Sequence, residues 1–204
     1  MLKKMDSAFV AAPLVQKGIR VVVIDYDLCP TVTLNEIVLQ VQKAFKWISE
    51  YLSRNSVKQL SIAGHSAGAH LLACVMTKEF VDSLHESVRV SAFYISGVYD
   101  LQELRLLKAA NENNILSLDE TNVVELSPQF YNFSHLKDRG IKSYVFVGEF
   151  ESPKFIEQSR NFAEGPFKSL SSVKFDVLKG LDHFDIVEKL SENDYEISKL
   201  ISKD

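Results

Sequence analysis

Residues 58–71 read KQLSIAGHSAGAHL, and this stretch decides the fold. Its first part, Lys58 to Ala63, has the apolar character of a strand, whereas Ala69 to Thr77 forms an apolar run of helical length. Between them, Gly64-His65-Ser66-Ala67-Gly68 has the form GxSxG. The two glycines let the chain turn sharply from strand into helix, so the serine between them stands above the sheet. The sequence therefore predicts an accessible hydroxyl at Ser66.

A serine hydroxyl needs a base before it can act as a nucleophile, and His183 is our candidate for that base. His183 occurs in Gly180-Leu181-Asp182-His183-Phe184, directly after the last predicted strand, so it should share the carboxyl edge of the sheet with Ser66. We expect the Ala67 amide to face the oxyanion that develops during attack. The flanking carboxylates, Asp182 and Asp185, are expected to shape the histidine loop.

Four other histidines compete with His183 for the role of base. Two lie beside the turn, where sequence neighbours are poorly placed to reach the serine hydroxyl; one lies in a polar, loop-like stretch and one precedes a strand. We expect these four to be structural or solvated: His65, His70, His85 and His135.

The acid that orients the histidine should follow the strand predicted at Ile141–Val147. The segment GEFESP, residues 148–153, offers two carboxylates there, and we favour Glu151. A carboxylate at this place would hold the imidazole in the useful tautomer and stabilise its charged form. Glu149, and Asp100 at the end of the preceding strand, remain alternatives.

The rest of the chain alternates between strand and helix patterns. Ser7–Gln16 has helical spacing, the β-branched run Arg20–Tyr26 (RVVVIDY) predicts a buried strand, and a capping box at Thr33–Glu36 opens a long amphipathic helix. Further strands are predicted at Val88–Ser96, Ile141–Val147 and Val173–Leu178. This order predicts an α/β fold with a mostly parallel sheet covered on both faces.

Residues 101–133 have no strand character, and Ser117 to Glu120 can cap a short helix there. Such an insertion either builds a wall of a pocket or makes a surface excursion.

Length, composition and charge limit the classes of function that the protein can have. With 204 residues, 46% hydrophobic and 25% charged, we expect a single domain spanning residues 1–204. The net charge of −4 disfavours a nucleic-acid partner, and neither a signal peptide nor a membrane span is recognisable. Cys29 and Cys74 have no zinc-type spacing and are expected to be reduced, buried thiols of a cytoplasmic protein. Oligomeric state is left open, a homodimer included.

Five segments together resemble one known family: Asp25-Tyr26-Asp27-Leu28-Cys29-Pro30, Gly64-His65-Ser66-Ala67-Gly68-Ala69-His70-Leu71, Ser96-Gly97-Val98-Tyr99-Asp100-Leu101, Ser127-Pro128 and Asp182-His183-Phe184. They are similar to kynurenine formamidases (arylformamidases), the insect enzymes especially, which are α/β-hydrolases with a three-layer sandwich. The resemblance covers essentially the whole chain. GHSAGAHL and SGVYDL are far more specific than GxSxG alone, although related esterases share parts of them.

The resemblance implies hydrolysis of N-formyl-L-kynurenine to L-kynurenine and formate in tryptophan catabolism, without a metal or organic cofactor. It implies a triad of Ser66, Glu151 and His183, although the family usually has aspartate where Glu151 stands. A general carboxylesterase and a catalytically silent binding protein of the same fold are the alternative functions. Comparing aryl formamides with longer-chain esters separates the first alternative, and activity that Ser66→Ala abolishes excludes the second.

One family motif is missing from the sequence. The family carries His-Gly-Gly-Tyr-Trp after an early strand, and the glycine amides of that motif complete its oxyanion hole. Met1 aligns just downstream, so we expect an N-terminally incomplete domain whose early strands are missing. The lost strand should leave a gap between Arg20–Tyr26 and Lys58–Ala63, and hydrolysis by this chain is expected to be weak or absent.

Overall fold

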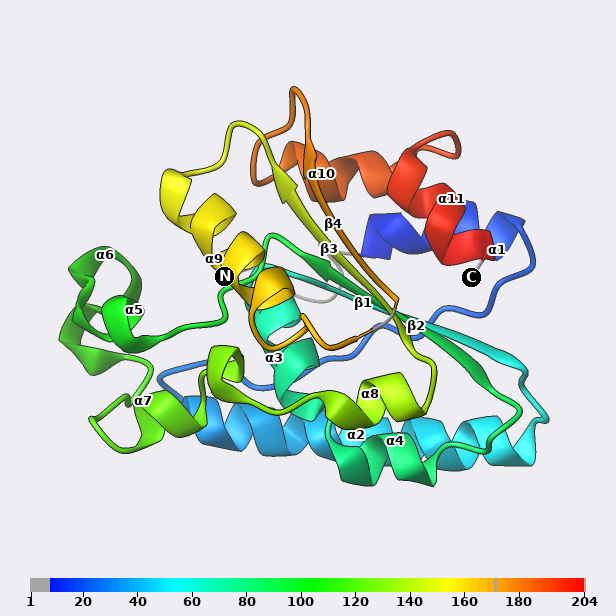
Figure 1. Ribbon diagram of the computed structural model, residues 1–204, viewed down its shortest axis with the longest axis horizontal. Helices are drawn as coiled ribbons and strands as arrows, with labels where there is room; N and C mark the ends of the chain where they lie inside the picture. The colour runs from blue at the N-terminus through cyan, green and yellow to red at the C-terminus, as the bar shows by residue number, and fades with distance from the viewer. Residues whose placement is uncertain (1–7, 171, 204) are drawn as a thin grey trace.

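Four parallel strands form one sheet in the order β1-β2-β3-β4. The computed structural model describes residues 8–170 and 172–203. The strands are β1 (Gln59–His65), β2 (Arg89–Ile95), β3 (Lys142–Gly148) and β4 (Val173–Leu178) (Figure 1). Because all four run in the same direction, their carboxyl ends meet at one edge of the sheet. The predicted parallel sheet is confirmed.

Helices cover both faces of this sheet, which gives the three layers of the predicted sandwich (Figure 1). One face carries α2 (Leu34–Arg54), α3 (Ala67–Val75), α4 (Lys78–Ser83), α8 (Ser134–Asp138) and α9 (Pro153–Glu164). The other face carries η1 (Ala8–Val10), α1 (Ala11–Gln16), α10 (Asp185–Glu188), η4 (Lys189–Ser191) and α11 (Glu196–Lys203). Each face has its own apolar cluster, so the sheet is buried between two cores.

Local sequence signals account for the longest helix, α2. The Thr33 hydroxyl accepts a hydrogen bond from the Glu36 amide (3.2 Å), and the Glu36 carboxylate accepts one from the Thr33 amide (2.7 Å). This reciprocal pair is the predicted capping box. The apolar residues that share one face of the helix pack into the core as expected: Leu34, Ile37, Val38, Val41, Phe45, Ile48 and Leu52. The helix predicted at Ser7–Gln16 is also present from Ala8; Ser7 lies outside the described residues.

The strand predicted at Arg20–Tyr26 is wrong. The chain there belongs to no strand, and Val22 and Val23 are 50% and 40% exposed. A β-branched run becomes a strand only where a neighbouring strand completes its hydrogen bonds, and no described strand pairs with this segment. On this side the described sheet ends at β1. Side-chain contacts hold the segment instead: the Arg20 guanidinium lies 5.5 Å from the Tyr51 ring centroid. The sheet ends at β1 rather than carrying the gap we expected.

Residues 101–133 contain no strand, as predicted. They form short helices instead: α5 (Gln102–Leu106), α6 (Lys108–Asn111), η2 (Glu112–Asn114), α7 (Asn122–Glu125) and η3 (Pro128–Phe130). Asp119, inside the predicted capping stretch, accepts hydrogen bonds from the amides of Thr121 and Asn122, both at 2.8 Å, in the turn before α7, whose N-cap residue is Thr121 and makes no side-chain cap.

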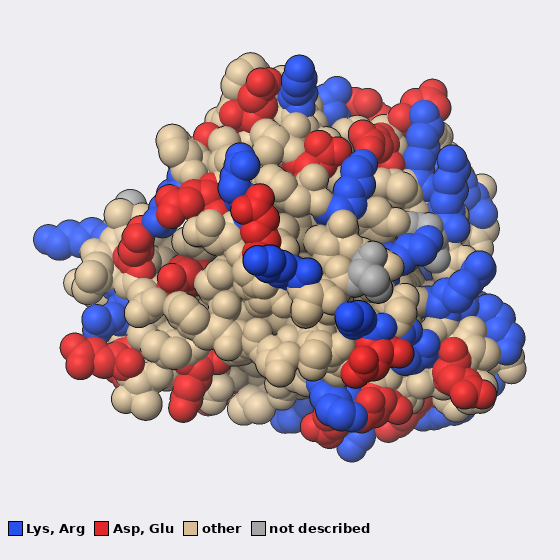
Figure 2. All heavy atoms as spheres, viewed as in Figure 1, with Lys and Arg blue, Asp and Glu red and all other residues tan. Residues whose placement is uncertain are grey.

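On the face shown in Figure 2, basic and acidic side chains are interspersed, and no single sign of charge covers the face. Cys29 and Cys74 are free and buried, as expected. Across residues 8–170 and 172–203, no helix has both the length and the apolar character that crossing a bilayer requires.

Candidate active site

Ser66 occupies the turn between β1 and α3. Its backbone has φ 55° and ψ −120°, a left-handed conformation that side chains rarely adopt. Gly64 makes the turn possible, because a Cβ at this position would lie 2.3 Å from the carbonyl oxygen of Gly68. The Ser66 amide donates to the Ile95 carbonyl (2.9 Å), which ties the turn to the end of β2. The strained backbone thus holds the hydroxyl at the carboxyl edge of the sheet.

The structure brings His183 and Glu151 to this hydroxyl. His183 Nε2 lies 3.1 Å from Ser66 Oγ, and His183 Nδ1 lies 2.8 Å from Glu151 Oε2. An ionised carboxylate can only accept, so Nδ1 carries the hydrogen and Nε2 presents its lone pair to the serine. This tautomer allows Nε2 to receive the hydroxyl proton.

Glu151 is buried, with none of its side chain exposed. Its Oε1 accepts hydrogen bonds from the Ser96 hydroxyl and from the Gly148 amide, the latter at 3.0 Å. Burial alone would raise the pKa of Glu151, but the hydrogen bonds from His183, Ser96 and Gly148 outweigh burial and hold the pKa below 4.5. The carboxylate is therefore charged at neutral pH.

The loop that carries His183 is built by its neighbours. Asp182 Oδ1 accepts from the amides of Phe184 and Asp185, both at 2.8 Å, so Asp182 shapes the loop as expected. Gly148 lets the loop approach β3, because a Cβ there would lie 2.4 Å from the Leu181 carbonyl oxygen.

Aromatic rings flank the imidazole of His183. The Phe155 ring centroid lies 4.7 Å away and that of Phe184 lies 5.4 Å away. Phe184 is 60% exposed, so one side of the site offers an aromatic surface to solvent.

The two alternative acids, Glu149 and Asp100, accept hydrogen bonds from other parts of the chain. Glu149 accepts from the Gly180 amide (2.8 Å), and Asp100 accepts from the Gln102 amide (2.9 Å). Both carboxylates thus stabilise turns, whereas Glu151 is the one in contact with His183.

The other histidines also find structural partners. His70 is buried against the Leu126 carbonyl (2.7 Å), and His135 contacts the Met76 carbonyl (2.8 Å). His85 lies in an exposed turn with Ser87 (2.9 Å). His65 contacts the candidate base itself, through the His183 carbonyl (2.8 Å). Sequence reasoning missed this contact and that of Ser96, since neither a histidine nor a serine at a strand end carries a signal for its tertiary partner.

Ala67, the expected oxyanion donor, is the first residue of α3 and is exposed. An amide at this position has no acceptor inside its helix and lies at the positive end of the helix dipole. It is therefore free to donate to an anion at Ser66.

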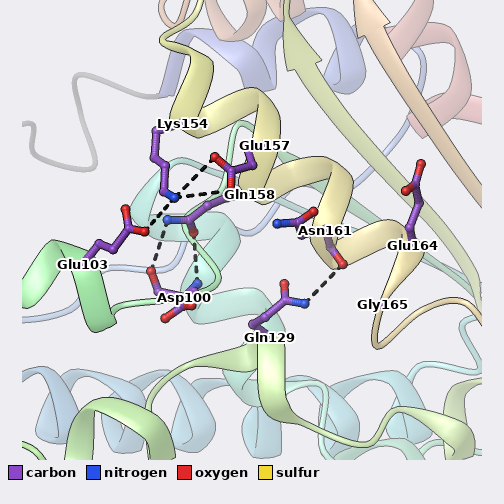
Figure 3. A pocket seen from close by; sticks show the side chains of 9 residues that line it. All are labelled: Asp100, Glu103, Gln129, Lys154, Glu157, Gln158, Asn161, Glu164 and Gly165. Carbon is purple, nitrogen blue, oxygen red and sulfur yellow. Dashed lines mark hydrogen bonds and ion pairs between the residues drawn. The ribbon is translucent and has the colours of Figure 1, made fainter.

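Two cavities lie away from Ser66 and His183. Figure 3 shows the first, about 430 Å³, which is lined by polar side chains of α9, the loop after β2, α5 and η3, including Asp100, Glu103 and Gln129. Lys154 Nζ forms an ion pair with Glu103 of α5 (2.8 Å) and another with Glu157 of its own helix (3.3 Å). The second, about 380 Å³, is lined partly by Asn122, Glu125 and Leu126. Residues 101–133 thus line part of both cavities.

Among residues 8–170 and 172–203, no group of three or more His, Cys, Asp or Glu side chains is placed to hold a metal ion.

A parallel sheet with a serine on the first strand-to-helix turn, an acid after the third strand and a histidine after the fourth defines an α/β-hydrolase. Residues 4–125 match the family described as the alpha/beta hydrolase fold. A curated relative, the kynurenine formamidase of Drosophila melanogaster, is 40% identical over 96% of this chain and 66% of its own length. The kynurenine formamidase of Danio rerio is 31% identical over 99% and 68%. The chain belongs to this family, the kynurenine formamidases of the α/β-hydrolase fold.

The chain spans about two thirds of the length of these relatives. Among solved structures, a protein from Silicibacter superimposes with a TM-score of 0.80, at 25% identity over 99% of this chain and 71% of that one. Carboxyl esterase 2 of Tuber melanosporum superimposes with a TM-score of 0.70, at 18% identity over 96% and 69%. These likenesses agree with the fold.

Proposed function

We propose that this chain hydrolyses N-formyl-L-kynurenine to L-kynurenine and formate in tryptophan catabolism. The observation that carries a serine-hydrolase mechanism is the position of His183, 3.1 Å from Ser66 Oγ and 2.8 Å from Glu151 Oε2. The formamide substrate is supported by curated relatives named kynurenine formamidase, which match almost the whole chain. These names favour a formamidase over a general carboxylesterase or a silent binding protein.

In the first half of the reaction, Ser66 is the nucleophile and His183 the base. His183 Nε2 takes the hydroxyl proton as Ser66 Oγ attacks the formyl carbon, and the Ala67 amide donates to the oxyanion. Glu151 stabilises the imidazolium that forms. The C–N bond then breaks, and His183 returns the proton to the leaving arylamine, which leaves as kynurenine.

In the second half, water releases formate. His183 takes a proton from water as the water oxygen attacks the formyl-serine ester. The C–O bond to Ser66 breaks, Oγ recovers its proton from His183, and formic acid leaves and releases its proton to solvent as formate. Enzyme and imidazole return to their starting states.

The aromatic rings beside His183 suit this substrate. The leaving group is an aryl amine, and it must pass close to Nε2 to receive its proton. Phe155 and the exposed Phe184 present ring surfaces beside the imidazole, where an aryl group would stack.

The experiment is hydrolysis of N-formyl-L-kynurenine by the purified 204-residue chain, followed by the appearance of kynurenine. Aryl esters with longer acyl chains are assayed beside it, and Ser66→Ala is the control. We expect weak formamide hydrolysis that Ser66→Ala lowers at least about 1,000-fold. A preference for longer esters would show that the chain is a carboxylesterase and not a formamidase. Hydrolysis that survives in Ser66→Ala would overturn the serine mechanism, and hydrolysis of neither substrate would overturn the proposal that this chain is itself active.

The setting we propose is a single domain in the cytoplasm, acting on a free small molecule without a nucleic-acid or membrane partner. Support for the compartment comes from Cys29 and Cys74, which are free thiols as in reducing compartments. The mixed charge in Figure 2 is unlike a nucleic-acid surface. Sedimentation would distinguish a monomer from a homodimer.

A further inference from the structure

His65 lies directly before Ser66, and its side chain reaches the loop that carries His183. The two imidazole centroids are 4.7 Å apart, and His65 Nε2 lies 2.8 Å from the carbonyl oxygen of His183. Side chains alternate along a strand, so His65 shares the face of β1 that carries Ser61. The Ser61 hydroxyl donates to the Ile201 carbonyl of α11, which identifies this face as the one that α11 covers.

Chemistry fixes the direction of the hydrogen bond between His65 and His183. A carbonyl oxygen can only accept, so His65 Nε2 carries the hydrogen. Burial, and then the electrostatic interaction with the His183 imidazole, lower the pKa of His65 to about 4. The His65 ring is therefore neutral at ordinary pH and donates through Nε2 alone.

The His183 loop is thereby held from two sides. On the β3 side, the Phe150 amide donates to the Leu181 carbonyl (2.9 Å). On the β1 side, His65 donates to His183 itself. The residue next to the candidate nucleophile thus contacts the backbone of the candidate base.

We propose that His65 is a positioning residue, whose Nε2–H holds the His183 backbone so that the base stays within hydrogen-bond reach of Ser66. This proposal rests on the proposed serine mechanism. It does not depend on which acyl substrate the chain hydrolyses.

The test compares three variants at one position: His65→Gln, His65→Asn and His65→Leu. Glutamine places an amide N–H the same number of bonds from Cα as His Nε2, whereas asparagine is one methylene shorter and leucine has no donor. The main readout is the rate at which a fluorophosphonate labels Ser66, because this rate reports proton removal by His183 without a natural substrate. The kcat and KM for N-formyl-L-kynurenine are measured beside it.

We expect His65→Gln to label within about threefold of the parent chain, and His65→Asn and His65→Leu to label about tenfold or more slowly, because small misplacements of reacting groups are costly. Any hydrolysis should lose kcat with KM nearly unchanged. Rescue by glutamine and not by asparagine would support positioning, because the two amides differ only in reach. A His65→Leu chain that labels as fast as the parent would overturn the proposal.

Folding is checked by circular dichroism and the unfolding midpoint. If His65→Leu does not fold, the Gln and Asn pair decides, and equal rates or a shared failure to fold would overturn positioning in favour of a general packing role. The proposed mechanism fails separately: it falls if the parent chain is not labelled or if Ser66→Ala is labelled equally. If the parent chain is labelled and His65→Leu is labelled at the same rate, only the proposed role of His65 is overturned, and the serine mechanism stands.

Discussion

Ser96 donates its hydroxyl hydrogen to Glu151 Oε1 from the end of the neighbouring strand. Ser96 is fully buried, as is the Glu151 carboxylate, so no solvent replaces this hydrogen bond when it is removed. The lowered pKa of Glu151 depends in part on Ser96. A serine that carries no reaction step therefore helps to keep the candidate acid ionised.

Ser96→Ala should destabilise the chain by about 1 to 3 kcal/mol, because a buried carboxylate loses a donor. The pKa of Glu151 should rise toward its ordinary value. A carboxyl pKa below 4.5 stabilises the fold above pH 4.5, and this stabilisation is lost as pH falls through the folded pKa. Because the folded and unfolded pKa values lie closer together in the variant, Ser96→Ala should lose less stability on acidification than the parent, and its loss should end at a higher pH. Urea unfolding against pH measures both effects. The control is Ser143→Ala, a buried serine whose hydroxyl has no partner in the described structure; an equal cost there would contradict the role of Ser96.

Glu151→Gln should lower kcat by about 1,000- to 10,000-fold, because a neutral amide neither fixes the His183 tautomer nor stabilises the imidazolium. Glu149→Gln and Asp100→Asn are matched controls, since those carboxylates serve turns. Both controls should stay within about threefold of the parent. Steady-state kinetics of the three variants decides the identity of the acid. A large loss of kcat in either control would assign the role of acid to that residue instead of Glu151.

Gly64→Ala should destabilise the chain by about 2 kcal/mol or more, because its new methyl would lie 2.3 Å from the Gly68 carbonyl oxygen and the backbone must move. Gly68→Ala has nothing within 4 Å of the new methyl. Since Gly68 lies inside α3, alanine should be neutral or stabilise the helix by about 0.5 to 1 kcal/mol. Denaturant unfolding of the pair tests the turn, and equal effects would show that the glycine packing is unimportant.

The free energy of unfolding should fall as pH is lowered from about 6.5 toward 4. His65 has a pKa of about 4 in the folded chain against 6.5 in a free side chain, so the unfolded state binds the extra proton in this window. Burial lowers the pKa of His70 too, which adds a loss of the same sign. His65→Gln should recover up to about 3 kcal/mol of the loss at the acid end. Parallel stability curves for parent and variant would refute the burial of a neutral His65.

The elements with strong local signals could be predicted from the sequence. The capping box and apolar face of α2 depend on residues within a few turns, and the core strands β2 and β3 are apolar runs buried on both faces. The run Arg20–Tyr26 was mistaken for a strand because its residues favour extended structure, whereas a strand also needs a neighbour, and none of the described residues supplies one. Partnership in a sheet is a property of the whole chain.

The residues of the candidate site also differ in whether the sequence alone could predict them. Ser66 stands in a motif with its own geometry, and His183 follows the last strand, so the sequence pointed to both. Glu151 had two rivals that only the folded contacts separate. Ser96 and His65 could not be found, because their partners lie 55 and 118 residues away along the chain.

The register of the sheet has a practical consequence. Ser66, Ser96, Glu151 and His183 follow β1, β2, β3 and β4 in turn, and the strand ends are aligned through pairs such as His65 with Ile95 and Gly148 with Leu178. A slip of one residue in any strand would turn its side chains to the opposite face and separate these groups. Reactivity at Ser66 would thus count the correctly assembled molecules in a preparation, and active-site titration could follow refolding more stringently than spectroscopic measures of helix content.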